Sequence, residues 1–299
     1  MKAVDALLAG LVDYAGLFPP AGEDMRTALE NYAAYAKGPD RPALGRFIVP
    51  VTRLEELEKA ADDLLPSGGM DEPWRLSVLV ADDVGGAVEQ MTRFNREHSS
   101  RSGYRAIIDV VEMKASTPKQ VVQQRDKVPA EFTPYFEIPL SGDLGSFIAD
   151  IAKAGGRAKV RTGGVTPDAF PAAEKLADFI VACAHEKVPF KATAGLHHPL
   201  HGDYRLTYEP DSARGSMYGF VNVFLASVMA YGGEGADACV AVLEETDRSA
   251  FAFEDDAIRW RGKSVTTAQI AKARSKFAIA FGSCSFREPV DELAALTRT

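Results

Sequence analysis

The chain has 299 residues, 46% of them hydrophobic and 25% charged, which suits one large α/β barrel or two smaller domains. Its formal net charge is −8, and Lys and Arg form no basic stripe, which argues against a nucleic-acid partner. Three cysteines without CxxC spacing argue against a disulfide framework and a cysteine zinc site, and are typical of reduced thiols in a cytoplasmic protein.

The first apolar stretch, residues 6–12, lies between Asp5 and Asp13. It is too short for a membrane span and lacks the tail of a signal peptide, so we expect no membrane partner.

Short apolar runs rich in β-branched residues then recur along the chain, most of them followed by a helical pattern. The first seven lie about 30 residues apart, the length of one βα unit, which predicts a parallel α/β architecture. We therefore expect a single (β/α)₈ TIM barrel domain over residues 1–299. The predicted strands are 11–18, 46–51, 75–81, 105–111, 134–139, 157–162, 190–195 and 278–285.

Capping signals mark where helices should begin and end. Capping boxes are predicted at Thr52 with Glu55, before a helix over 54–65, and at Thr117 with Gln120. Thr166 and Pro167 should open a helix running to about residue 185, and Gly155 and Gly156 should close a helix over 143–154.

The segment between the last two strands is far longer than one βα unit. We interpret residues 197–265 as an insertion with a polar loop, an apolar helix over 218–231 and a hairpin formed by 251–253 and 258–261. A capping box of Thr266 and Gln269 follows. Such an insertion serves either as a lid or binding loop or as a subunit interface in a homo-oligomer, and the sequence leaves both open.

The sixth and seventh predicted strands share one pattern: a lysine, a polar residue two places on and a glycine four places on. Alternation puts Lys159 and Arg161 on one face of their strand, and Lys191 and Thr193 on one face of theirs. A lone strand lysine is more often on a solvated face. Two in equivalent places on successive parallel strands favour a functional pair at the barrel rim, where barrel active sites form.

Paired lysines suit carbonyl chemistry, because a neutral lysine can form a Schiff base with a carbonyl substrate. Only about 1 in 2,500 ordinary lysine side chains is neutral at pH 7. Partial burial and a second cation nearby can lower a lysine pKa toward neutrality, and Lys159, Lys191 and Arg161 on adjacent strands are predicted to do this.

The segments 159–163 and 191–195 resemble the paired lysine motifs of class I aldolases of the deoxyribose-phosphate aldolase type. Three more pieces are similar to that family in the same chain order: residues 11–17 with Pro20 and Ala21, Ile108-Asp109-Val110, and the turn 281–285.

The resemblance implies a role for each matching residue. Lys159 would be the Schiff-base lysine, Lys191 would lower its pKa, and Asp109 would assist proton transfer. Ser283 and Ser285 would lie near a phosphate site. The chain departs from the family in Arg161, in its histidine cluster and in the insertion, so the deoxyribose phosphate reaction itself is not implied.

Other polar side chains allow two interpretations each. Glu137 either pairs with Lys159 or acts as a base. Asp13 either reaches the lumen or caps the turn before Pro19. His197 and His198, with His201 nearby, form either a metal site completed by Glu137 or Asp109, or polar rim groups of which one acts in acid–base chemistry.

We predict an enzyme, an aldolase-type lyase that acts through a lysine Schiff base on a small oxo-acid or sugar-like substrate, with or without a phosphate, and needs no cofactor. Arg161 would bind a substrate carboxylate or phosphate. Two alternatives remain: a metal-dependent lyase, isomerase or hydrolase that uses a divalent metal at the histidines, and a non-enzymatic barrel that binds small anions.

Overall fold

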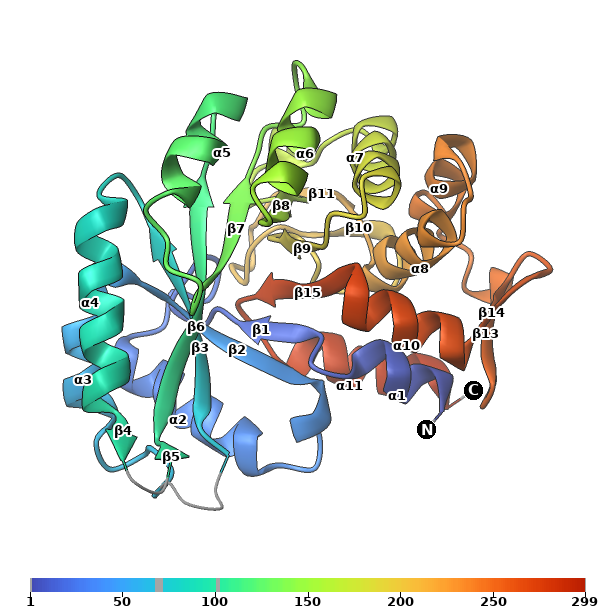
Figure 1. Cartoon of the computed structure of the whole chain (residues 1–299). Helices are drawn as coiled ribbons and strands as arrows, with labels where there is room; N and C mark the ends of the chain where they lie inside the picture. The colour runs from blue at the N-terminus through green and yellow to red at the C-terminus, as the bar shows by residue number, and fades with distance from the viewer. Residues whose placement is uncertain (1, 68–71, 101–102, 299) are drawn as a thin grey trace.

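A computed structural model describes residues 2–67, 72–100 and 103–298 of the chain (Figure 1). Its centre is a closed barrel of parallel strands in the order β1-β15-β9-β8-β7-β6-β3-β2, which confirms the predicted TIM barrel. All eight predicted strands are present, with small differences at their ends. They are β1 (Val12–Tyr14), β2 (Leu44–Pro50), β3 (Trp74–Val80), β6 (Ala106–Lys114), β7 (Thr133–Glu137), β8 (Arg157–Arg161), β9 (Phe190–Thr193) and β15 (Ala278–Ser283).

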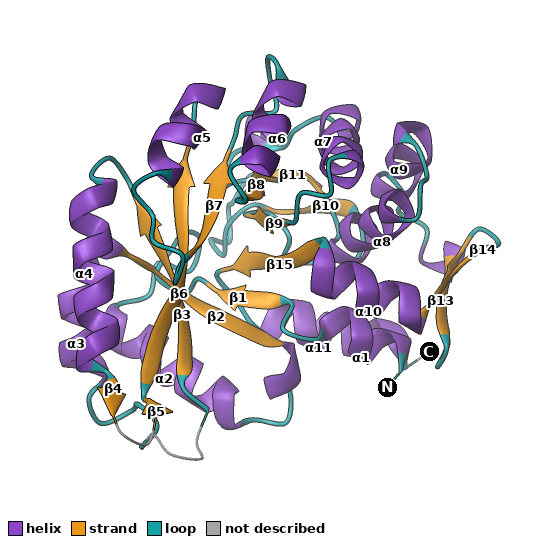
Figure 2. Ribbon diagram, viewed as in Figure 1, coloured by secondary structure: helices purple, strands orange, loops and turns teal. Residues whose placement is uncertain are grey.

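Helices surround this barrel on the outside (Figure 2). Their apolar faces pack against the strands, so the hydrophobic core is the layer between the helices and the barrel. None of the described helices is long and apolar enough to cross a membrane. The helices are α1 (Ala3–Leu8), α2 (Met25–Lys37), α3 (Leu54–Ala61), α4 (Val84–Glu97), α5 (Pro118–Arg125), α6 (Leu144–Lys153), α7 (Ala173–His185), α8 (Phe220–Tyr231), α9 (Ala236–Leu243), α10 (Thr267–Lys276) and α11 (Arg287–Thr297).

Two of the predicted capping boxes form. Thr117 caps α5 with Gln120, and Thr266 caps α10 with Gln269. Gly155 follows α6 with a φ of 64°, the left-handed end that a glycine there favours.

One predicted capping box and one predicted helix start are wrong, although α3 begins at Leu54 as predicted. The box at Thr52 is absent because Val51–Arg53 form a short 3₁₀ turn, and the N-cap of α3 is Arg53, whose side chain caps nothing. The helix expected from Thr166 is split, since a 3₁₀ turn, Pro167–Ala169, is followed by Phe170 and Pro171 before α7 begins at Ala173.

The predicted insertion has more structure than its sequence suggested. Its polar loop contains a hairpin of β10 (Gly202–Arg205) and β11 (Arg214–Met217), and the expected apolar helix is α8, which is buried along almost its whole length. The second hairpin gains a third strand, so that β12 (Phe251–Phe253), β13 (Ala257–Trp260) and β14 (Lys263–Thr266) form a small sheet. Both chain termini lie near this sheet (Figure 1).

Candidate active site

Three neighbouring barrel strands carry charged side chains in one row. The register pairs Glu137 of β7 with Lys159 of β8, and Lys159 with Lys191 of β9. The Nζ of Lys159 lies 2.7 Å from Oε2 of Glu137, which confirms the predicted pairing of these two side chains. The strand order therefore brings both predicted lysines to the same height in the lumen.

Glu112 of β6 joins the two lysines. Its Oε2 lies 2.8 Å from Nζ of Lys159, and its Oε1 lies 2.6 Å from Nζ of Lys191. Asp13 of β1 contacts Lys191 from the other side, at 2.5 Å from Oδ2 to Nζ. These five side chains, Asp13, Glu112, Glu137, Lys159 and Lys191, form what we call the lysine–carboxylate cluster.

Burial and charge set the ionisation of this cluster. Burial alone would lower the pKa of Lys191, but the charges and hydrogen bonds of Asp13 and Glu112 outweigh it and raise that pKa above its ordinary value. Burial alone would raise the pKa of Glu112, but Lys159 and Lys191 hold it far below its usual range. Glu137 follows the same rule, because Lys159 and then Arg161 lower its pKa against the effect of burial.

This arrangement differs from the predicted one in an important respect. We expected the two lysines and Arg161 to repel one another and so to lower a lysine pKa. Instead a carboxylate separates the two ammonium groups, and Lys191 is held in its charged form. Lys191 is therefore a fixed positive charge beneath the site.

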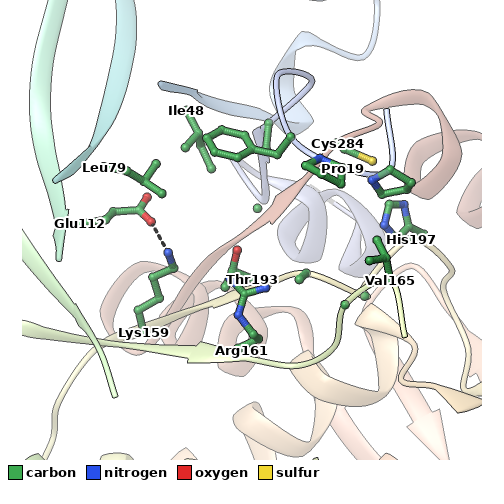
Figure 3. Close-up of a pocket in the computed structure, with 17 residues that line it drawn as sticks. Pro19, Ile48, Leu79, Glu112, Lys159, Arg161, Val165, Thr193, His197 and Cys284 are labelled. Carbon is green, nitrogen blue, oxygen red and sulfur yellow. Dashed lines mark ion pairs between the residues drawn. The ribbon is translucent and has the colours of Figure 1, made fainter. Parts of the chain in front are cut away.

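A cavity of about 280 Å³ opens at the C-terminal ends of the strands, and we call it the inner cavity (Figure 3). Lys159 and Glu112 line it, whereas Lys191 is 1% exposed and lies outside its lining. Access therefore distinguishes the two lysines. The lining consists of Ala15, Phe18, Pro19, Pro20, Ile48, Leu79, Glu112, Lys159, Arg161, Gly164, Val165, Thr193, Ala194, Gly195, His197, Gly282 and Cys284.

Three residues predicted to bind substrate also line the inner cavity: Arg161, Thr193 and His197. Arg161 follows Lys159 on the same face of β8, and its side chain is 51% exposed, with Nε 3.5 Å from Oε1 of Glu137. Thr193 follows Lys191 on β9. In Figure 3 the first two lie between Lys159 and His197, so a bound molecule could contact an amine, a guanidinium and a hydroxyl at once.

The structure does not bring Asp109 to the lysines. Its carboxylate accepts hydrogen bonds from Arg46, at 2.7 and 2.8 Å, and from Arg75, both near the N-terminal ends of their strands. Arg46 and Arg75 keep the pKa of Asp109 low although burial alone would raise it. Asp109 therefore stabilises the opposite end of the barrel from the inner cavity.

Asp13 reaches the lumen, as one of its two interpretations required, but it lies outside the lining of the inner cavity. Its Oδ1 accepts the backbone N–H of Arg46 at 2.7 Å. A Cβ on Gly45 would collide with that same oxygen, so the glycine makes room for the aspartate. Asp13 positions Lys191 and does not line the inner cavity.

The three clustered histidines have separate partners. Nδ1 of His197 lies 3.0 Å from Oε2 of Glu288, and Nδ1 of His198 lies 2.9 Å from Oε2 of Glu292. His201 contacts the carbonyl of Leu243 and the hydroxyl of Ser216. Among residues 2–67, 72–100 and 103–298, no three His, Cys, Asp or Glu side chains are grouped so that they could hold a metal ion.

The serines of the last strand form a turn of their own. Oγ of Ser283 accepts the N–H of Ser285, and Oγ of Ser285 accepts the N–H of Glu288 at the start of α11. The N–H groups of Ser285 and Glu288 are thus already donors within the turn.

Comparisons with family models, curated proteins and solved structures found no match to this chain.

Sequence reasoning missed three residues of this region. Glu112 and Ser77 escaped notice, although the Oγ of Ser77 donates a 2.5 Å hydrogen bond to Glu112 inside the lumen. A carboxylate within the apolar run Val110-Val111-Glu112-Met113 carried the same signal that singled out Glu137. Glu288 lies on the last helix, and nothing local in the sequence relates it to His197.

Proposed function

We propose that this chain is an aldolase-type lyase that acts through a Schiff base on Lys159. The observation that carries the proposal is the difference between its two lysines. Lys159 lines the inner cavity and has two carboxylates in contact with its nitrogen, whereas Lys191 is buried behind it and held charged by Asp13 and Glu112.

The contacts of Lys159 supply a route for its proton. A lysine must lose a proton before its nitrogen can attack a carbonyl carbon. Glu112 and Glu137 lie 2.8 and 2.7 Å from that nitrogen, within the range for direct proton transfer. The buried ammonium of Lys191 beside Glu112 opposes a proton there, which favours Glu137 as the acceptor.

The proposed reaction begins when the neutral Nζ of Lys159 attacks the substrate carbonyl. The carbonyl oxygen takes up two protons and leaves as water, which gives an iminium. The bond between the α and β carbons then breaks, and its electron pair enters the iminium to form an enamine. The β-hydroxyl passes its proton to Glu112 or Glu137 and becomes an aldehyde. Protonation of the enamine carbon and hydrolysis release the second product and the amine.

Arg161 is suited to orient an acidic substrate. Its planar guanidinium can bind a carboxylate through two parallel hydrogen bonds. It lines the inner cavity two residues from Lys159 on the same strand face. A 2-oxo acid held by Arg161 would therefore present its carbonyl carbon toward Lys159.

Borohydride trapping tests the proposal. The protein is incubated with a panel of small 2-oxo acids and hydroxyaldehydes and reduced with sodium borohydride. Its intact mass is then measured by mass spectrometry. We expect a covalent adduct in the native protein and none in Lys159→Arg, which keeps the positive charge beside Glu112 and Glu137 but cannot form the imine.

The control is Lys153→Arg, because Lys153 is an exposed lysine on α6 that contacts only Asp150 among the described residues. It should be trapped like the native protein. Two results would contradict the proposal. One is that the protein converts a substrate but no compound of the panel forms an adduct with it. The other is that Lys159→Arg is trapped as well as the native protein.

A further inference from the structure

A second cavity adjoins the inner one. It has a volume of about 280 Å³ and shares Pro20 and His197 with the inner cavity. We call it the outer cavity, and its polar lining comes mainly from the β10–β11 hairpin and from α11. Its polar lining includes His197, His198, Tyr204, Arg205, Tyr208 and Glu288.

We propose that the outer cavity binds the far end of the substrate, and that this end is a neutral polyhydroxylated chain. The inference rests on the proposed function, because it places the reacting carbonyl at Lys159. Figure 3 shows His197 and Lys159 on opposite sides of the inner cavity. A molecule that reaches from one cavity into the other must therefore pass His197.

The chemistry of the outer cavity suits hydroxyl groups. The carboxylate of Glu288 accepts a 2.8 Å hydrogen bond from Oη of Tyr208 and contacts His197 at 3.0 Å, which leaves free acceptor positions on its oxygens. Arg205 is exposed and has no ion pair with any described residue, so its donors are available. Carboxylate acceptors and guanidinium donors in the lining of one cavity match hydroxyls, which both donate and accept.

Tyr208 adds an aromatic surface. This residue is 51% exposed. Val165, another large apolar side chain that is exposed, lines the inner cavity. The ring of Tyr208 can pack against the C–H groups of a sugar-like chain while its hydroxyl stays bonded to Glu288.

The same residues disfavour a phosphate at this end. Burial alone would raise the pKa of Glu288, but its bonds to His197 and Tyr208 lower it, so the carboxylate is negatively charged. It lies in the first turn of α11, where its charge already offsets the positive end of the helix dipole. Arg214, the second arginine of the outer cavity, is paired with Asp203 at 2.6 Å. In this lining a phosphate would meet the Glu288 carboxylate, two histidines that already contact Glu288 and Glu292, and one arginine without an ion pair to a described residue.

The test compares D-ribose with D-ribose 5-phosphate, which differ only at the far end. Their dissociation constants are measured by calorimetry on the native protein, on Glu288→Gln, and on Glu131→Gln as a distant control on the surface. We expect the native protein and the control to bind ribose at least about tenfold more tightly than its phosphate. In Glu288→Gln ribose should weaken and the phosphate strengthen, so that the ratio falls.

Tighter binding of the phosphate by the native protein, no detectable binding of ribose, or an unchanged ratio in Glu288→Gln would overturn the inference. The Lys159→Arg variant separates this outcome from the proposed chemistry. It should keep the preference for ribose even though it cannot be trapped by borohydride, so loss of trapping and loss of the preference report on different claims.

Discussion

Glu112 is the side chain on which the lysine–carboxylate cluster depends, and Glu112→Gln is the change that tests this. The substitution keeps the shape of the side chain but removes the charge that contacts Lys159 at 2.8 Å and Lys191 at 2.6 Å. Both lysines and Glu112 are at most 4% exposed, so these contacts lie largely away from bulk solvent although Lys159 and Glu112 line the inner cavity. Removing one partner of a buried ion pair costs about 3–5 kcal/mol. We therefore expect the free energy of unfolding to fall by that amount.

Glu55→Gln is the matched control. Glu55 also contacts a lysine, Lys59, at 2.7 Å, but both side chains are more than 70% exposed. An exposed pair contributes about 0–1 kcal/mol. The two substitutions therefore remove the same chemical group from the same kind of partner, and they differ in burial.

Urea unfolding followed by circular dichroism at pH 7 measures both variants. Equal slopes with a lower midpoint in Glu112→Gln would show a change in stability rather than in the unfolded state. The same loss should lower the melting temperature by roughly 10 °C. A loss in Glu112→Gln no larger than that in Glu55→Gln would refute the view that the cluster is a tightly coupled buried network.

Three further outcomes are expected. Stability should fall as the pH drops below about 4.3, the ordinary pKa of a glutamate. The folded-state pKa values of Glu112 and Glu137 are lowered, so the stability that these two carboxylates contribute is lost when they are protonated. Acid titration followed by circular dichroism measures this, and constant stability down to pH 2 would contradict it. Arg274→Met should cost about 2–5 kcal/mol in urea unfolding, since the buried guanidinium donates to backbone carbonyls of both the α1–β1 region and β15, and an unchanged midpoint would count against that role. Thr117→Ala should cost about 1 kcal/mol by the same measurement because it removes the cap of α5, and an unchanged midpoint would show that the box contributes nothing.

The barrel could be predicted from the sequence because its signals are local. Each βα unit carries its own apolar run and turn residues, and these recur at the length that one unit requires. The pairing of Glu137 with Lys159 was also predictable, since adjacent parallel strands place equivalent positions side by side. The failed capping box at Thr52 shows the limit of such patterns, because a 3₁₀ turn over Val51–Arg53 takes up Thr52 although α3 begins at Leu54 as predicted.

The prediction of Asp109 and the omission of Glu112 have a different physical cause. Strict alternation puts residues three apart on opposite faces of a strand. The register between β3 and β6 shifts near Ile108, however, so that Asp109 contacts Arg75 while Glu112 contacts Ser77, although Arg75 and Ser77 share one face of β3. An irregularity of this kind has no clear mark in the sequence, and it exchanges one carboxylate for another.

The partners of the histidines could not be predicted for a third reason. Glu288 and Glu292 are separated from His197 and His198 by about 90 residues, and only the closure of the barrel brings α11 beside the start of the insertion. A metal site and a set of separate ion pairs look alike until that closure is known.

The attachment point of a trapped carbonyl tests the central claim most directly. After borohydride reduction with an adduct-forming 2-oxo acid or hydroxyaldehyde, the protein is digested and the modified peptide is sequenced by mass spectrometry. The account predicts modification at Lys159, which lines the inner cavity, and none at Lys191, which is buried and held charged. An adduct on Lys191, or on a surface lysine with Lys159 unmodified, would contradict it.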